Sequence, residues 1–153
     1  MSTISSYYRV MKQKRRLIYQ LNTARHTMMK SMDAGCKEAL DVSVVQLSAL
    51  MVVNENNGIL MKDLANFLML DKSAVTGLAK RMQERGLIKK VACSEDSRAS
   101  RLMMTDQGKA SLYKGLSLLK GINSEMEAGF TEQELDTVSR FLSHITTLFS
   151  KKN

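Results

Sequence analysis

The chain has 153 residues, the length of one ordinary domain that buries its own core. Its 44% hydrophobic and 25% charged residues exclude a disordered protein, and its net charge of +8 favours a polyanionic partner. The absence of Trp and the 5% aromatic content argue against stacking on single-stranded nucleic acid. Because no long apolar run, secretory signal or set of paired cysteines is present, we expect a cytoplasmic protein.

Two helices are predicted in the first third of the chain. Apolar side chains recur at helical spacing over residues 6–33, and this pattern breaks near Gly35. Asp41 or Ser43 is expected to cap a second helix, which ends at the turn over residues 54–58. The apolar face predicted for this second helix consists of Val44, Val45, Leu47, Leu50, Met51 and Val53.

A short extended pair at Ile59 and Leu60 and a helix of about eight residues are expected next. Asp71 then interrupts the pattern where the N-cap of a further helix should lie, and Gly86 marks that helix's end. One face of this helix is apolar and comprises Val75, Leu78, Ala79 and Met82. The other face carries Lys72, Ser73, Thr76, Gly77, Lys80 and Arg81.

The polar face of this helix suits the major groove of double-stranded DNA. Its short side chains let the backbone approach the base edges, and its longer cations reach the phosphates. A plain amphipathic surface helix has the same pattern, so the helix alone leaves both interpretations open.

The segment that follows favours DNA binding. Residues 87–92 and 100–104 are predicted to be strands joined by a charged loop, which gives a β-hairpin wing. Arg98 at the tip is placed to enter a minor groove, where the negative potential attracts guanidinium, and Asp96 is placed to orient it. Ser97 and Arg101 complete the set of hairpin residues expected to contact DNA.

Thr105 is expected to cap the first of two helices over residues 106–149, and Thr131 with Glu134 forms a capping box before the second. Both helices and the first long helix carry more apolar surface than a lobe of this size can cover. This surplus predicts a partner subunit.

The sequence resembles the MarR family of bacterial transcription regulators. The resemblance rests on LANFLMLDKSAVTGLAKRMQERGLIKKVACSEDSRASRLMMTDQGKA and covers roughly residues 15–148. It implies a mainly α fold with a small β-hairpin wing: one domain over residues 1–153, with a winged helix-turn-helix lobe at 43–104, its helix-turn-helix at about 61–85 and its wing at about 87–104. It also implies a homodimer joined through helices at 6–33 and 106–149, a pseudo-palindromic operator, and a ligand pocket for a small aromatic compound. The twelve methionines are expected first to fill gaps in the core; if the pocket is present, its expected neighbours are Met28, Met29, Met51 and Tyr113.

Neither enzymatic nor metal chemistry is predicted. Phosphate loops, nucleophile elbows and zinc motifs are absent, and His26 and His144 do not lie at ligand spacing with other donors. Cys36, just beyond the first helix, is expected to be buried or idle. Cys93, at the wing base, is expected to be exposed, and whether either thiol senses oxidants stays open.

Three functions are compatible with these features of the sequence. The favoured one is a dimeric repressor released from its operator by a small ligand. The second is an activator or antirepressor of the same fold without an inducer. The third, a membrane-surface protein using the basic N-terminal helix, is disfavoured because the cations surround that helix instead of forming one polar face.

Overall fold

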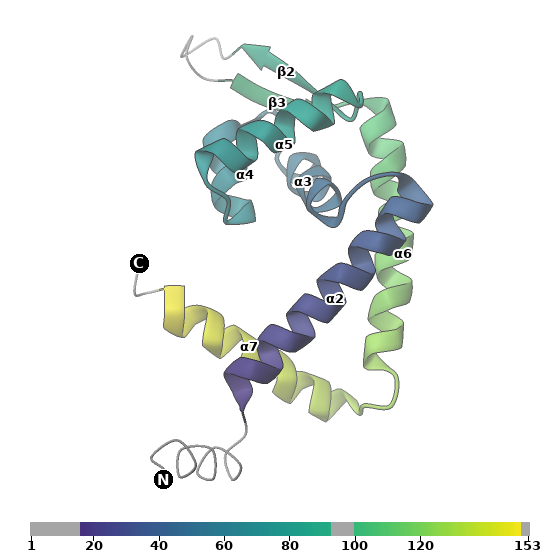
Figure 1. Ribbon diagram of the computed structural model, residues 1–153, viewed down its shortest axis with the longest axis vertical. Coiled ribbons are helices and arrows are strands. Elements are labelled where there is room, and N and C mark those ends of the chain that lie inside the picture. Colours follow the sequence, from purple (N-terminus) through teal and green to yellow (C-terminus); the bar gives the residue numbers. More distant parts are fainter. Residues whose placement is uncertain (1–15, 93–99, 151–153) are drawn as a thin grey trace, which may run out of the picture. The chain divides into compact units, whose positions relative to one another are not determined.

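The computed structural model describes residues 16–92 and 100–150, drawn in colour in Figure 1. The chain forms two compact units, one up to Gly115 and one from Leu116 onward. The described residues comprise six helices and a three-stranded antiparallel sheet.

The long first helix, α2 (Leu17–Leu40), ends later than predicted. The expected end at residue 33 is wrong, because the helix continues through Gly35 to Leu40 and stops where Asp41 takes the left-handed conformation (φ 55°). Cys36 therefore lies inside the helix, where it is completely buried. Burial of this turn outweighs the cost of one helical glycine, about 1 kcal/mol. The predicted start at residue 6 lies outside the described residues.

Helix α3 (Val44–Glu55) begins with a capping box. The Ser43 hydroxyl accepts from the Gln46 amide at 3.2 Å, and the Gln46 side chain accepts from the Ser43 amide at 2.9 Å. Of the two predicted caps, Ser43 is therefore the cap of α3, whereas Asp41 ends α2. Val45 was expected to face the core, but it is 39% exposed. The predicted turn after α3 is present, with Gly58 at a φ of 83°.

The lobe continues through strand β1 (Ile59–Leu60), helix α4 (Met61–Leu68) and helix α5 (Lys72–Glu84), as the sequence predicts. Helix α4 packs against both α3 and α5, and α5 also packs against the first hairpin strand (Figure 1). The core lies between these elements, with Leu50, Leu64 and Met82 completely buried.

The predicted hairpin consists of β2 (Ile88–Ala92) and β3 (Ser100–Met104), paired antiparallel. The sheet order is β1-β3-β2, so β3 is the middle strand. Leu102 of β3 faces Ile59 of β1 on one side and Lys90 of β2 on the other. The sequence predicts the hairpin and the extended pair at residues 59–60, but not the pairing of β1 with β3.

Helix α6 (Asp106–Glu127) leaves the lobe at Thr105. The Thr105 hydroxyl accepts from the Gly108 amide at 3.0 Å and donates to the Gly86 carbonyl at 2.5 Å. Thr105 is thus the predicted cap, and it ties the start of α6 to the segment between α5 and β2.

The second unit holds the later part of α6 and helix α7 (Glu132–Ser150). The predicted capping box is present, with the Thr131 amide donating to Glu134 at 2.9 Å and the Glu134 amide donating to the Thr131 hydroxyl at 3.4 Å. No described side chain of α7 is buried. Among the described residues, none of the helices combines the length and apolar character needed to cross a membrane.

Candidate nucleic-acid interface

Helix α5 is held in place at its N-terminus by Asp71. One carboxylate oxygen of Asp71 accepts from the Ala74 amide and from the Ser73 hydroxyl, both at 2.7 Å. These hydrogen bonds, the Ala74 amide first, lower the pKa of Asp71. The negative charge also complements the helix dipole, so the start of α5 is fixed by local interactions.

The two faces of α5 differ as the sequence predicts. Val75, Leu78, Ala79 and Met82 are each at most 4% exposed and anchor the helix in the core. The opposite face turns its side chains to solvent. Its exposed members are Lys72, Ser73, Thr76, Lys80 and Arg81, with Gly77 half-buried among them.

Gly77 leaves space for Arg81 one turn later on the same face. A β-carbon at position 77 would lie 3.3 Å from a terminal guanidinium nitrogen of Arg81. The glycine therefore lets this guanidinium lie close to the helix backbone. Lys80 is held more loosely. Its ammonium nitrogen lies 3.9 Å from a carboxylate oxygen of Glu84, and both side chains are exposed.

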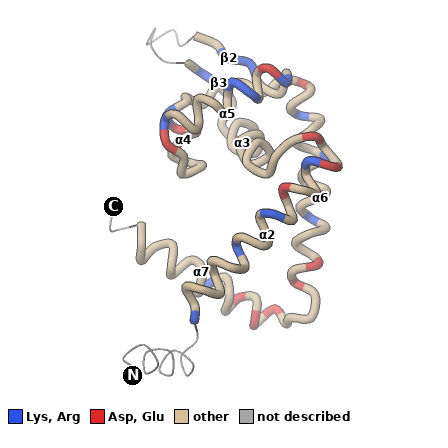
Figure 2. The backbone as a smooth tube through the Cα atoms, in the orientation of Figure 1, with Lys and Arg blue, Asp and Glu red and all other residues tan. Residues whose placement is uncertain are grey.

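The hairpin adds further cations next to this helix. Figure 2 shows Lys and Arg on α5 and on both strands. Arg101 of β3 donates to the Gly58 carbonyl at 3.0 Å and so also braces the turn before β1. Lys89 and Lys90 of β2 are exposed and were not among the predicted contacts, although two adjacent lysines in a strand are a readable signal. Cys93, Asp96, Ser97 and Arg98 lie outside the described residues.

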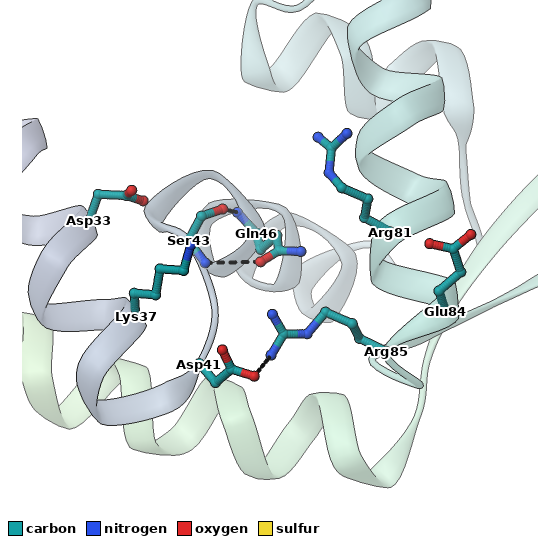
Figure 3. A pocket seen from close by; sticks show the side chains of 8 residues that line it. All are labelled: Asp33, Lys37, Asp41, Ser43, Gln46, Arg81, Glu84 and Arg85. Carbon is teal, nitrogen blue, oxygen red and sulfur yellow. Dashed lines mark hydrogen bonds and ion pairs between the residues drawn. The ribbon is translucent and has the colours of Figure 1, made fainter.

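A polar cavity of about 430 Å³ lies between the end of α2, the start of α3 and the end of α5 (Figure 3). A second cavity, of about 320 Å³, lies between the end of α2 and the start of α6. Neither is lined by the predicted pocket residues Met28, Met29, Met51 and Tyr113. The first cavity is lined by Asp33, Lys37, Asp41, Ser43, Gln46, Arg81, Glu84 and Arg85.

The described residues contain no cluster of three or more His, Cys, Asp or Glu that could hold a metal ion. The thiol of Cys36 is buried, and burial together with the nearby Asp33 carboxylate raises its pKa. A raised pKa lowers the thiolate fraction and hence the reactivity of this cysteine.

A helical lobe whose last helix exposes a cationic face, followed at once by an antiparallel hairpin, is a winged helix-turn-helix. Residues 40–99 match the sequence model of the MarR family. This match, the curated relatives and the solved structures all indicate a MarR-family transcription regulator.

Individual relatives agree with this assignment. The chain is 27% identical over 107 residues to the uncharacterized HTH-type transcriptional regulator YybA of Bacillus subtilis, covering 69% of this chain and 71% of that protein. The fold is similar to S. aureus MepR in a complex with DNA, with a TM-score of 0.82, 17% identity and coverage of 89% and 100% of the two chains. It is also similar to the PcaV regulator of Streptomyces coelicolor bound to its natural ligand, with a TM-score of 0.72, 20% identity and coverage of 86% and 89%.

Proposed function

We propose that this chain is a homodimeric repressor that binds a pseudo-palindromic operator in double-stranded DNA. Helix α5 enters the major groove, where Lys72, Ser73, Thr76, Gly77, Lys80 and Arg81 face the DNA. The wing contacts the adjacent minor groove through Ser97, Arg98 and Arg101, with Asp96 orienting Arg98. Repression follows because a dimer lying across an operator excludes the polymerase from the same DNA.

The observation that carries the proposal is the exposed face of α5. Five of its side chains are exposed, whereas the four apolar side chains behind them are buried. Apart from Lys72, the exposed side chains in the first two turns of α5 are short and polar. Those in the following turn, Lys80 and Arg81, are cations. This order suits base edges at the N-terminal end and phosphates further along.

The apolar surface of the second unit supports the homodimer. Val138, Leu142 and Leu148 of α7 are 45–49% exposed. Large apolar side chains that recur along one helix without cover in their own chain are typical of subunit contacts. Two copies that bury them against each other would present two lobes to two half-sites.

A small ligand is part of the proposal because the similar PcaV structure holds its natural ligand, and the resemblance to the family implies that the ligand is aromatic. The two described cavities are lined mostly by polar and charged side chains. Aromatic ligands favour apolar linings, so these cavities support the second candidate, an activator or antirepressor without an inducer. Thermal unfolding with a panel of phenolic compounds separates the two, since an inducer raises the melting temperature of the repressor.

Selection of bound duplexes from a random DNA library tests the DNA-binding proposal. We expect one palindromic sequence to be enriched. Arg81→Ala and Arg98→Ala should each weaken binding to it by about 1–3 kcal/mol. Lys120→Ala, which removes an exposed cation from α6, is the matched control and should leave the affinity nearly unchanged. Enrichment of no sequence would contradict the proposal, and unaltered affinity of Arg98→Ala would contradict the wing assignment.

A further inference from the structure

The end of helix α5 is joined to the end of helix α2 by an ion pair between Arg85 and Asp41. A guanidinium nitrogen of Arg85 lies 2.6 Å from a carboxylate oxygen of Asp41, although the two residues are 44 positions apart. Each residue terminates its helix, since Asp41 is the C-cap of α2 and Arg85 the C-cap of α5. Figure 3 shows the pair at the edge of the polar cavity.

Inside the cavity, no apolar side chain of the described residues packs between α5 and α2. All eight residues that line the cavity are polar or charged. Within the described part of the chain, Asp41–Arg85 is the sole hydrogen bond or ion pair between residues 17–41 and helix α5. Among these described residues, the polar link between the ends of α5 and α2 therefore consists of one contact.

The attachment of α2 to α3 is different. The Asp33 carboxylate accepts from the amide of Val44, the first residue of α3, at 3.0 Å. Cys36 and Val42 are at most 1% exposed and pack the same end of α2 into the core. Because α2 is fixed to α3 by buried side chains, it is a firm reference against which α5 can be oriented.

We propose that the Asp41–Arg85 pair is a latch that sets the angle of the recognition helix α5 relative to α2, and thereby the half-site spacing that the dimer accepts. This inference rests on the proposed function, in which α2 is part of the dimer and α5 reads DNA. Arg85 acts here through the placement of Lys80 and Arg81, so it is a positioning residue. The pair is partly exposed, with side-chain exposures of 35% and 80%, so it contributes little to folding and can act on orientation without controlling stability.

Electron–electron distance measurements test the latch without DNA. Spin labels are attached to Thr27→Cys on α2 and Gln83→Cys on α5, both exposed, in a Cys93→Ser background that leaves only the buried Cys36. Labelled chains are diluted with unlabelled ones, so that distances within one chain dominate. We expect one narrow distance in the parent and a broadened or shifted distance in Asp41→Asn, which retains a residue tolerant of the left-handed conformation. Arg85→Lys should keep the narrow distance of the parent, because the ion pair uses a single nitrogen of Arg85 and a lysine ammonium can replace it.

Binding to the selected operator then tests the functional consequence. Duplexes with the half-sites moved by one base pair in either direction are compared with the selected spacing. We expect Asp41→Asn and Arg85→Gln to reduce the preference for the selected spacing by about fivefold, the factor that corresponds to an exposed ion pair. The double variant should behave like either single variant, since both remove the same interaction.

Lys109→Gln is the matched control, because it removes the exposed Lys109–Asp106 pair of α6, whose atoms lie 3.6 Å apart. It should change neither the distance nor the spacing preference. An unchanged distance in Asp41→Asn would overturn the latch, and a changed distance with the parent's spacing preference would overturn its role in DNA recognition. If the parent bound no duplex, the proposed function would fail, while the distances would still decide whether the latch exists.

Discussion

A β-carbon on Gly108 would overlap the carbonyl oxygen of Leu87, so the first turn of α6 lies directly against the segment that joins α5 to β2. The obstacle is backbone and cannot rotate away. We expect Gly108→Ala to lower the free energy of unfolding by at least about 1–3 kcal/mol, the usual cost of overpacking. Chemical denaturation with circular dichroism measures this change.

Gly121→Ala is the control for this prediction, because a β-carbon there meets nothing within 4 Å. Alanine is favoured over glycine in an exposed helix by up to about 1 kcal/mol, so this variant should be slightly more stable than the parent. Equal effects of the two substitutions would show that the close approach of α6 to Leu87 is not tight in solution.

The N-cap Asp71 makes the stability of the lobe depend on acidity. Because its pKa is lowered in the folded chain, its contribution is complete above the ordinary pKa of an aspartate and is lost as the pH falls toward the lowered value. Asp71→Asn keeps an oxygen acceptor but cannot ionise. Melting temperatures should therefore be higher for the parent at neutral pH, and the difference from Asp71→Asn should shrink in acid.

Asp71→Ala completes this series, because it removes both the charge and the acceptor. It should be less stable than Asp71→Asn at every pH. A constant difference between parent and Asp71→Asn from neutral to acid pH would show that the ionised carboxylate is not favoured by folding.

Cys36 is expected to be unreactive in the folded protein. It is completely buried, and its raised pKa leaves little thiolate near neutral pH. In Cys93→Ser, Cys36 is the single thiol, so its reaction with an aromatic disulfide reagent can be followed by absorbance. The reaction should be slow in buffer and fast in denaturant, and similar rates in the two conditions would contradict the burial.

The apolar face of α7 predicts the oligomeric state. Leu142→Glu places a charge among the exposed apolar side chains of this helix and should shift the protein from a dimer toward the monomer mass of 17.2 kDa in light scattering. Thr147→Glu puts the same charge on the side of the helix away from Val138 and Leu142 and should leave the dimer intact. A monomeric parent would contradict the homodimer itself.

The sequence predicts the features that depend on local pattern. The caps Asp71, Thr105 and Thr131 and the buried face of α5 are present as expected, because they rest on spacings of three or four residues. The predicted end of α2 was wrong, because the burial of Cys36 outweighs the local break at Gly35. That burial depends on contacts outside the helix, which the local sequence pattern does not reveal.

The features that were missed join distant parts of the chain. Residues 44 positions apart form the Asp41–Arg85 pair, and β1 pairs with a strand more than 40 residues later. No local periodicity indicates such contacts. The charged residues of the polar cavity were likewise unpredictable as a group, because they come together from the ends of α2 and α5, which are distant in the sequence.

Strand β2 ends the sheet, since β3 is its neighbour and no further described strand lies beyond it. An uncovered strand edge can recruit the same edge of another molecule and start aggregation. Lys89 and Lys90 are exposed on this edge, so two copies that approach through it bring four ammonium groups together. The lysines that favour a polyanion thus also oppose the pairing of two copies through β2.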